Sequence, residues 1–328
     1  MSSAASAMDS MRLLMACKKR REKEALRLLE RPDIDVNQVN EKGHSALIYA
    51  CREDMVSVAL RLLERPDINV NQVGKYGYTA LTWACKNNSE AVVLKLLERP
   101  DINVNHVDLL GYTALSWACE DKVEAVVLGL LRRPDLDVAL VIKGGDTALT
   151  HACYCEMEAE ALRLIENPAV DVNQVEEYGN TALILACDRG MEELALKLLE
   201  RPDINVNQVN TDGDTALILA CKNNMEAVAL RLLERQDINV NQVNYYSESP
   251  GFLDADFERP HRCDRLNKDG NTALMWACKN NMEAVALKLL ERQDIDINQE
   301  NEDGYTALIF ATENNMYSVI SRITEITQ

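Results

Sequence analysis

The sequence has few aromatic residues, few histidines and no long apolar stretch. Only 5% of its 328 residues are aromatic, and four are histidine. No segment approaches the roughly 18 consecutive apolar residues that a membrane-spanning helix requires. Residues 1–9 are small and polar and contain no apolar segment of the kind found in a secretory signal. We therefore expect a protein that is neither secreted nor embedded in a membrane.

Positive charge is also scarce. The chain has 35 Lys and Arg residues against 53 Asp and Glu residues, which gives a net charge of −18. The average field of such a surface repels phosphate groups, so nucleic acid and anionic membranes are poor partners. Charge complementarity instead favours a partner protein with basic segments.

Motifs of catalysis and metal binding are missing. The sequence has no Gly-rich phosphate loop, no paired-Cys zinc spacing and no nucleophile elbow. Its histidines are scattered, although His151 and Cys155 at positions i and i+4 could present two ligands from one helix face. Two ligands do not make a metal site. We predict a protein without a catalytic site, cofactor or metal.

What the sequence has instead is a 34-residue repeat. Glycines mark it at Gly43, Gly77, Gly111, Gly145, Gly179 and Gly213, and again at Gly270 and Gly304. The interval between Gly213 and Gly270 is 57 residues, which corresponds to one repeat plus an insertion of 23. Counting backwards from Gly43 adds one more unit, so the chain comprises nine units, of which the first and last are truncated.

Within one unit the residues predict two helices and an extended finger. Gly77 allows a backbone turn, and Thr79 is placed to cap the helix that follows. Asn88 stands where a left-handed residue ends a helix, and residues 90–98 form a second, amphipathic helix. A proline then ends this helix, and alternating apolar and polar residues up to Asn105 predict an extended arm. One unit cannot bury its apolar face alone, so the units must stack.

Eight of the ten cysteines occupy one position of the repeat. Equivalent positions in stacked helices lie about 8–10 Å apart, beyond the roughly 7 Å limit for a disulfide. We therefore predict a column of small buried thiols in a reducing compartment. The eight residues are Cys17, Cys51, Cys85, Cys119, Cys153, Cys187, Cys221 and Cys278.

The pattern Gly-x-Thr-Ala-Leu-x-x-Ala-Cys, followed by Leu-Leu and Val-Asn, closely resembles the ankyrin repeat. The resemblance covers the chain from Met11 to Gln328 apart from the insertion. It implies an all-α fold with short β-hairpin fingers, a solenoid of about nine stacked helix-turn-helix units. We expect residues 1–10 to form a flexible N-terminal tail, residues 11–328 a single domain, and residues 245–267 a loop inserted into one finger.

The resemblance also implies that partner proteins bind the finger tips and the concave face of the first helices. One position of the first helix holds aromatic residues in several units. These side chains are either wedges between finger and helix or a contact stripe on the concave face, and the sequence leaves both interpretations open. The candidates for partner contact at this position are Tyr49, Trp83, Trp117, His151 and Trp276.

The finger tips vary along the chain. Most are polar or charged, as at residues 41–42, 211–212, 268–269 and 302–303. Two neighbouring units carry large apolar side chains there instead, beside Trp83 and Trp117. A contiguous exposed apolar patch usually marks an interface, so we predict partner binding here; the alternative is that these tips pack only on each other. The residues are Tyr76, Tyr78, Leu109, Leu110 and Tyr112.

The insertion contains Phe252 and Phe257, two of the three phenylalanines of the chain. Loops of this length without regular structure are commonly functional or disordered. The segment is therefore either a solvated loop or a second recognition element, in which Ser249 before Pro250 is a candidate for modification.

These observations predict a non-catalytic, intracellular protein-binding module, an adaptor or a masking protein, that acts as a monomer in the cytoplasm, with the nucleus left open. One alternative is a self-associating scaffold in which the apolar patch forms a homodimer interface. The resemblance implies another, because the family includes substrates of asparagine hydroxylation. In this sequence the corresponding positions are Asn71, Asn105, Asn207 and Asn241.

Overall fold

The computed structural model describes residues 3–244 and 270–328. By its internal contacts the chain divides into two compact units, Met1–Val170 and Asp171–Gln328, which we call the N-terminal unit and the C-terminal unit. A single domain over residues 11–328 stays a prediction. The insertion, with Phe252, Phe257 and Ser249, lies outside the described residues.

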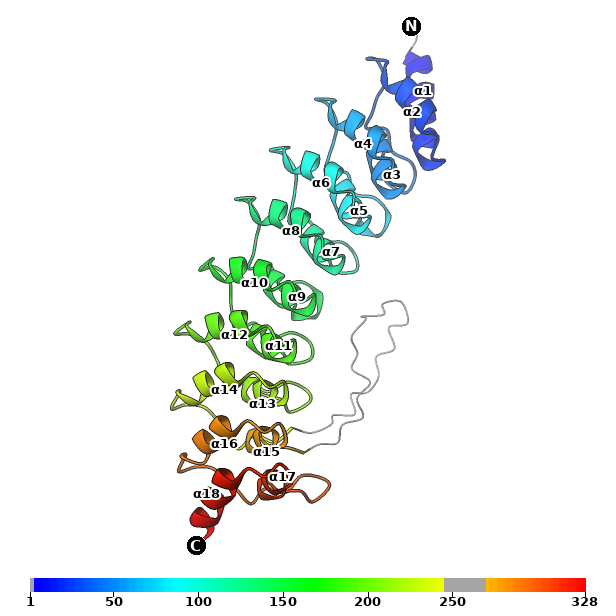
Figure 1. Ribbon diagram of the computed structural model, residues 1–328. Coiled ribbons are helices and arrows are strands. Elements are labelled where there is room, and N and C mark those ends of the chain that lie inside the picture. Colours follow the sequence, from blue (N-terminus) through cyan, green and yellow to red (C-terminus); the bar gives the residue numbers. More distant parts are fainter. Residues whose placement is uncertain (1–2, 245–269) are drawn as a thin grey trace. The chain divides into compact units, whose positions relative to one another are not determined.

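The N-terminal unit consists, over its described residues, of five helix pairs (Figure 1). The first helices of the pairs contact one another in chain order, the second helices do the same, and the core lies between the two rows. The pairs are α1 (Ser3–Lys18) with α2 (Glu22–Leu29), α3 (Ala46–Arg52) with α4 (Val56–Leu63), α5 (Ala80–Lys86) with α6 (Glu90–Leu97), α7 (Ala114–Glu120) with α8 (Glu124–Leu131), and α9 (Ala148–Tyr154) with α10 (Glu158–Ile165).

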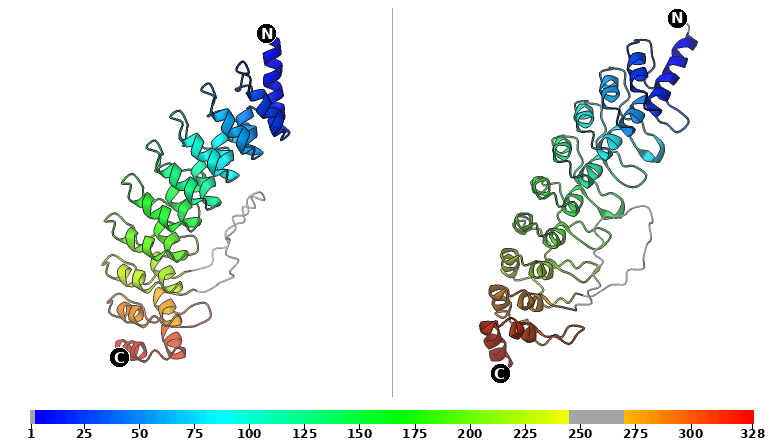
Figure 2. Two further views of the ribbon diagram at one scale, coloured as in Figure 1. Left: turned by 45° about the horizontal axis from the view of Figure 1, so that its top comes forward. Right: turned by 45° about the vertical axis from the view of Figure 1, so that its right-hand side comes forward.

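The C-terminal unit repeats this arrangement with four helix pairs in its described residues, again stacked in two rows (Figure 2). The two units thus contain the nine helix pairs that the repeat predicts. The pairs are α11 (Ala182–Asp188) with α12 (Glu192–Leu199), α13 (Ala216–Lys222) with α14 (Glu226–Leu233), α15 (Ala273–Lys279) with α16 (Glu283–Leu289), and α17 (Ala307–Glu313) with α18 (Tyr317–Thr327).

Local sequence sets where each first helix begins and ends. The Thr79 hydroxyl accepts a hydrogen bond from the Thr82 backbone N–H at 3.2 Å and caps α5, and the other units use serine or threonine in the same way. The predicted left-handed residues end these helices, with φ of 54° at Asn88 and 69° at Gly190. The prediction of caps and stops is confirmed.

The fingers between helix pairs are turns, and the expectation of short β-hairpins is not met. Within the described residues, the only β-pairing is an isolated bridge between Val243 and Thr272. In a typical finger the Asn40 N–H donates to the His44 carbonyl at 3.1 Å, and Ser45 then caps α3 at once. Because α3 begins directly after this hydrogen bond, the two arms of the finger do not form the further backbone hydrogen bonds that a β-hairpin requires.

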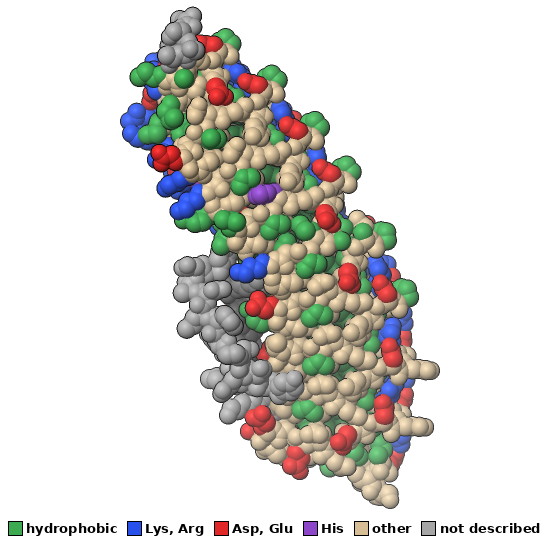
Figure 3. All heavy atoms as spheres, turned by 180° about the vertical axis from the view of Figure 1, so that it is seen from behind, with side chains coloured by type: hydrophobic (Ala, Val, Ile, Leu, Met, Phe, Trp, Pro, Cys, Tyr) green, Lys and Arg blue, Asp and Glu red, His purple; other side chains and the backbone are tan. Residues whose placement is uncertain are grey.

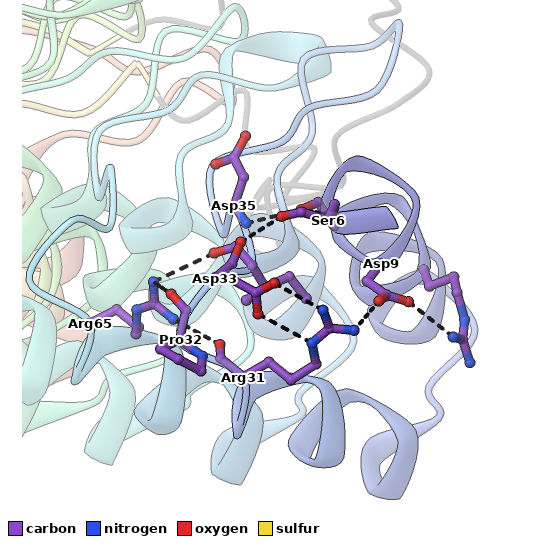
Figure 4. Close-up of polar contacts among 10 residues, drawn as sticks. Ser6, Asp9, Arg31, Pro32, Asp33, Asp35 and Arg65 are labelled. Carbon is purple, nitrogen blue, oxygen red and sulfur yellow. Dashed lines mark hydrogen bonds and ion pairs between the residues drawn. The ribbon is translucent and has the colours of Figure 1, made fainter. Parts of the chain in front are cut away.

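The expected flexible tail is helical instead, because α1 begins at Ser3. The Ser6 hydroxyl donates to the Asp33 carbonyl at 2.5 Å, and the Ser10 hydroxyl accepts from the Asp35 N–H at 2.9 Å. Figure 4 shows Arg31 between Asp9 of α1 and Asp33 of the turn after α2, with ion pairs to both. Sequence pattern could not show this helix, because its polar side chains bind a turn more than twenty residues away.

Asparagines tie each finger to the next one within a unit. The Asn105 carboxamide donates to the Asp135 carbonyl at 2.7 Å and accepts from the Asp137 N–H at 2.8 Å. Asn207 makes the same two bonds in the C-terminal unit, to the Asp237 carbonyl and from the Asn239 N–H. The residues that resemble hydroxylation sites therefore use their carboxamides as inter-repeat clamps.

Candidate functional site

Large apolar side chains are exposed on three consecutive fingers of the N-terminal unit. We call this set the tip patch; the sequence predicted three of its members, Tyr76, Leu109 and Leu110, and missed the other three. Leu109 is 77% exposed and Tyr76 is 54% exposed. The complete set is Val73, Tyr76, Val107, Leu109, Leu110 and Val141.

Neighbouring fingers of the tip patch contact each other along their sides. The Leu109 N–H donates to the Tyr76 carbonyl at 3.0 Å, which joins two tips directly. A Cβ on Gly77 would lie 2.7 Å from the Leu109 nitrogen, and one on Gly111 would lie 2.3 Å from Cβ of Lys143. Both glycines have positive φ, so only glycine allows this approach. The exposed side chains thus form one surface rather than separate points.

Tyr76 is held in a sparsely populated backbone conformation. Its φ is 67° within the short 3₁₀ segment η1 (Lys75–Gly77), a region that residues with a Cβ rarely adopt. The Lys75 ammonium lies 4.2 Å from the centre of the tyrosine ring. A strained residue that keeps an aromatic ring in solvent is typical of a functional surface.

A second group of the predicted residues lies beneath the fingers and forms an aromatic stack: Tyr78, Trp83, Tyr112, Trp117 and His151. Ring centres are 4.7 Å apart for Tyr78 and Trp83, 5.0 Å for Tyr112 and Trp117, and 5.9 Å for Tyr112 and His151. Tyr78 and Trp117 are buried, and burial raises the pKa of Tyr78 to about 12. These rings join the helix of one repeat to the finger of another.

The aromatic position of the first helix is therefore a wedge between finger and helix. Trp117, His151, Tyr49 and Trp276 are each only 3–6% exposed, and Trp83 is half-buried. Within the described residues these four side chains are buried and do not form an exposed stripe, and their role in partner contact stays a prediction. Sequence pattern cannot reveal this burial, because it depends on contacts between residues that are distant in sequence.

Asp108 fixes the tip that carries Leu109 and Leu110. Its buried carboxylate accepts from the Trp117 indole N–H at 2.9 Å and from the N–H groups of Leu110 and Tyr112 at 2.9 and 3.0 Å. One side chain thus links the wedge below to the tip above. Because the carboxylate is satisfied by these donors, both leucines are held outward without an unpaired buried charge.

The exposed tips of the N-terminal unit carry basic side chains. Lys42, Lys75 and Lys143 are exposed, whereas Asp108 and Asp146 at the same fingers are buried. Figure 3 shows Lys and Arg side chains together with hydrophobic ones along one edge of this unit. The local charge at the tip patch is therefore opposite in sign to the net charge of the chain.

Amides and carboxylates join neighbouring fingers of the C-terminal unit, although the last finger also carries Tyr305, whose ring stacks on Phe310. We call their buried hydrogen-bonded series the polar ladder. The Asn180 amide donates to Glu176 at 2.8 Å, the Asn210 amide to Asn180 at 3.0 Å, and the Asn301 amide to Asn271 at 3.0 Å. Asp214 belongs to it through Asn244, and burial raises the pKa of Asp214 to about 6. The exposed, described tips here are acidic: Glu177, Asp212, Glu300, Glu302 and Asp303.

The predicted thiol column is present. Its eight cysteines are free and at most 1% exposed. Burial raises the pKa of Cys17 to about 12 and raises the pKa values of Cys51, Cys119 and Cys187 as well. Thiols in this state are neither nucleophiles nor ready metal ligands.

Within residues 3–244 and 270–328, no group of three or more His, Cys, Asp or Glu side chains could hold a metal ion. His151 Nε2 lies 3.7 Å from the Glu120 carboxylate, and Cys155 is buried. In the same described part of the chain, no helix combines the length and the apolar character that crossing a membrane would require.

The family described as ankyrin repeats (three copies) matches residues 13–108, 61–139, 115–210, 159–244 and 252–325. The chain belongs to the ankyrin repeat family. Such repeats are generally protein–protein interaction modules, and members of the family are typically not catalysts.

Two solved structures share the fold of this ankyrin repeat protein. One is the ankyrin repeat domain of Bcl-3, described as a unique member of the IkappaB protein family; it is 23% identical, with a TM-score of 0.52, over 67% of this chain and 96% of that chain. The other is the ankyrin repeat protein EF0377, which is 22% identical with a TM-score of 0.50, over 57% of this chain and 95% of that one. No curated protein matches the sequence.

Proposed function

We propose that this ankyrin repeat protein is a non-catalytic protein-binding module and that the tip patch of the N-terminal unit is its principal binding surface. The observation that supports this most is the exposure of Tyr76, Leu109 and Leu110 side by side on fingers held by backbone bonds and a buried carboxylate. Apolar patches of this kind on a folded surface usually mark protein interfaces. An adaptor or masking role in the cytoplasm agrees with this surface.

Rigid fingers favour binding by a preformed surface. Trp117 and Asp108 hold the tips from below, so few side-chain and backbone motions are lost when a partner binds. Leu109 stands outward without touching the core, and Tyr76 contributes a large ring with few rotatable bonds.

We predict that Leu109→Asp weakens partner binding by about 2 kcal/mol or more, the usual threshold of a hot spot. Helix content and thermal unfolding should barely change, because Leu109 is 77% exposed. The measurement is affinity capture from native cells, followed by calorimetry with the recovered partner.

The chain offers a matched pair for this test. Tyr76 and Tyr178 occupy the same position of the repeat, both are exposed, and each carbonyl accepts a bond from the next finger. Tyr76→Asp should weaken binding, and Tyr178→Asp in the C-terminal unit should not. Equal affinities for the wild type, Leu109→Asp and Tyr76→Asp would show that the tip patch is not the binding site.

Self-association through the same patch is the competing function, because an isologous dimer would also bury these residues. Light scattering separates the two: a homodimer that Leu109→Asp dissociates would replace the adaptor proposal. Hydroxylation of Asn105 or Asn207 would first require a finger to open, since both ends of each carboxamide are bonded.

A further inference from the structure

The tip patch differs in charge from the rest of the molecule. Two exposed lysines, Lys75 and Lys143, lie on its fingers. A third, Lys42, lies on the preceding finger and acts electrostatically on Tyr76, and its neighbour Glu41 is the one exposed acidic residue on these described tips. The two other carboxylates there, Asp108 and Asp146, are 4% and 3% exposed. A partner that approaches these tips therefore meets positive charge beside apolar side chains.

A second observation places cations around the same fingers. Burial lowers the pKa of His44 at the base of the first finger, and four positive side chains lower it further: Arg52, Lys42, Lys18 and Lys75. The four come from helices α1 and α3 and from two neighbouring fingers. These four side chains, distant in sequence, therefore all act electrostatically on the same imidazole.

The helix ends beneath the patch carry both positive and negative side chains. Arg52 lies 5.5 Å from the ring centre of Trp83, and the Lys86 ammonium lies 3.5 Å from that of Trp117. Acidic groups are present as well, at Glu53, Glu120 and Asp121. The excess of positive charge is therefore strongest at the tips themselves and weaker toward the helices.

We infer that the tip patch binds a partner segment that combines acidic residues with large apolar ones. This inference rests on the proposed function. Apolar side chains of the segment would pack on Tyr76, Leu109 and Leu110, while its carboxylates would face Lys42, Lys75 and Lys143. Complementary charge sets the register and speeds the encounter. This partner class is opposite to the basic one that the net charge of −18 predicts, because charges separated by more than about 8 Å are largely screened at physiological salt.

The test is a selection from a random peptide library with the full-length chain as bait. The selected peptides should be rich in Asp and Glu together with Leu, Phe or Trp, and added salt should lower their affinity for the chain. Their affinity should fall about tenfold for the double variant Lys42→Glu, Lys75→Glu, because each reversal replaces an attraction between exposed charges by a repulsion.

The matched control is the double variant Arg61→Glu, Lys95→Glu. It changes the net charge by the same amount on α4 and α6 of the same unit, and both side chains are about half exposed. It should leave the affinity within about twofold. Thermal unfolding of both variants shows that the fold is retained.

The outcomes separate this inference from the proposed function. Selected peptides rich in Lys and Arg, or stronger binding by the Lys42→Glu, Lys75→Glu variant, would overturn the proposed partner class. If Leu109→Asp still abolished binding in that case, the proposed binding surface would stand. Selected peptides whose affinity is the same for the wild type, the Lys42→Glu, Lys75→Glu variant and Leu109→Asp would overturn the inference and the proposed surface together. A selection that enriches no peptide above the library background, or a bait that only captures its own copies, would also overturn the inference.

Discussion

The two units share one repeat and one packing scheme but build their fingers from different chemistry. In the N-terminal unit, the residue after the turn glycine carries a ring in three fingers and an acid in the fourth, and the rings join finger to helix; the four are His44, Tyr78, Tyr112 and Asp146. In the C-terminal unit, three fingers have an amide or acid there and hydrogen bonds join finger to finger, whereas the last finger has an aromatic ring stacked on Phe310; the four are Asn180, Asp214, Asn271 and Tyr305. The difference shows that the helices fix the scaffold, whereas one finger position decides how the tip is held.

The residues that hold each finger go together with the kind of side chain that its tip exposes. In the finger whose tip lies above the Tyr112 and Trp117 rings, the apolar residues Leu109 and Leu110 are exposed. A finger held by amides keeps polar groups at its base, and its tip is acidic. The units therefore differ most in what they present to a partner, and least in what they bury.

The strongest test of the comparison is Trp117→Ala. A buried tryptophan lost from the aromatic stack should cost about 3–5 kcal/mol of unfolding free energy, which urea unfolding measures. Trp117→Phe keeps a ring but removes the donor to Asp108, and should cost about 1–3 kcal/mol. Partner binding by the alanine variant should fall through loss of the fold. A loss below about 1 kcal/mol for Trp117→Ala would show that the stack does not support the fingers.

The second test uses pH on the polar ladder. The pKa of Asp214 is raised to about 6, chiefly by burial, from 3.8. Folding therefore favours the protonated acid, so its stabilisation is fully present below about pH 4 and is lost as pH rises through 6. The loss should be about 2–3 kcal/mol.

Asp214→Asn is the control for this pH effect, because Asn180 and Asn271 occupy the same position in neighbouring repeats. The variant should be more stable than the wild type at pH 7 and should lack the loss between pH 4 and 6. Urea unfolding across that range decides the matter, and an identical pH profile for both proteins would contradict the assignment of the effect to Asp214.

The asparagine clamps should behave alike in both units. Asn105→Ala and Asn207→Ala each remove a donor and an acceptor between fingers, and each should cost about 1–2 kcal/mol. Hydrogen exchange should report faster opening of the finger that follows. A large effect in one unit and none in the other would mean that the clamps belong to the difference between units rather than to the shared scaffold.

The smallest effects are expected in the thiol column. Cys85→Ala and Cys187→Ala should each cost about 1 kcal/mol, because a buried thiol mainly fills volume. Reductant should leave the melting temperature unchanged, and iodoacetamide should label these cysteines only on unfolding, since their pKa values are raised. A melting temperature that rises without reductant, with a disulfide between column cysteines, would contradict the spacing argument.

Much of the fold could be predicted from the residues alone. The glycine spacing, the Thr79 cap and the left-handed Asn88 are local signals, and each acts within a few residues of itself. The candidate site could be predicted in part, because Tyr76, Leu109 and Leu110 interrupt a pattern of polar tips. Val73, Val107 and Val141 were missed although they share one position of the repeat. Nothing in the stretches Val-Asn-Gln-Val, Val-Asn-His-Val and Val-Ala-Leu-Val tells which valine the finger leaves exposed.

By itself, the sequence determined the repeat, its helix pairs, its thiol column and its membership of the ankyrin repeat family, because these follow from periodic residues that act locally or on the adjacent repeat. Only the tertiary structure decided that Trp117 is a buried wedge, that residues from Ser3 form a helix, and that Lys75 stands beside exposed apolar tips. Those features depend on contacts between residues distant in sequence. Charge and hydrophobicity counted along a chain cannot show which side chains a folded finger covers and which it leaves in solvent.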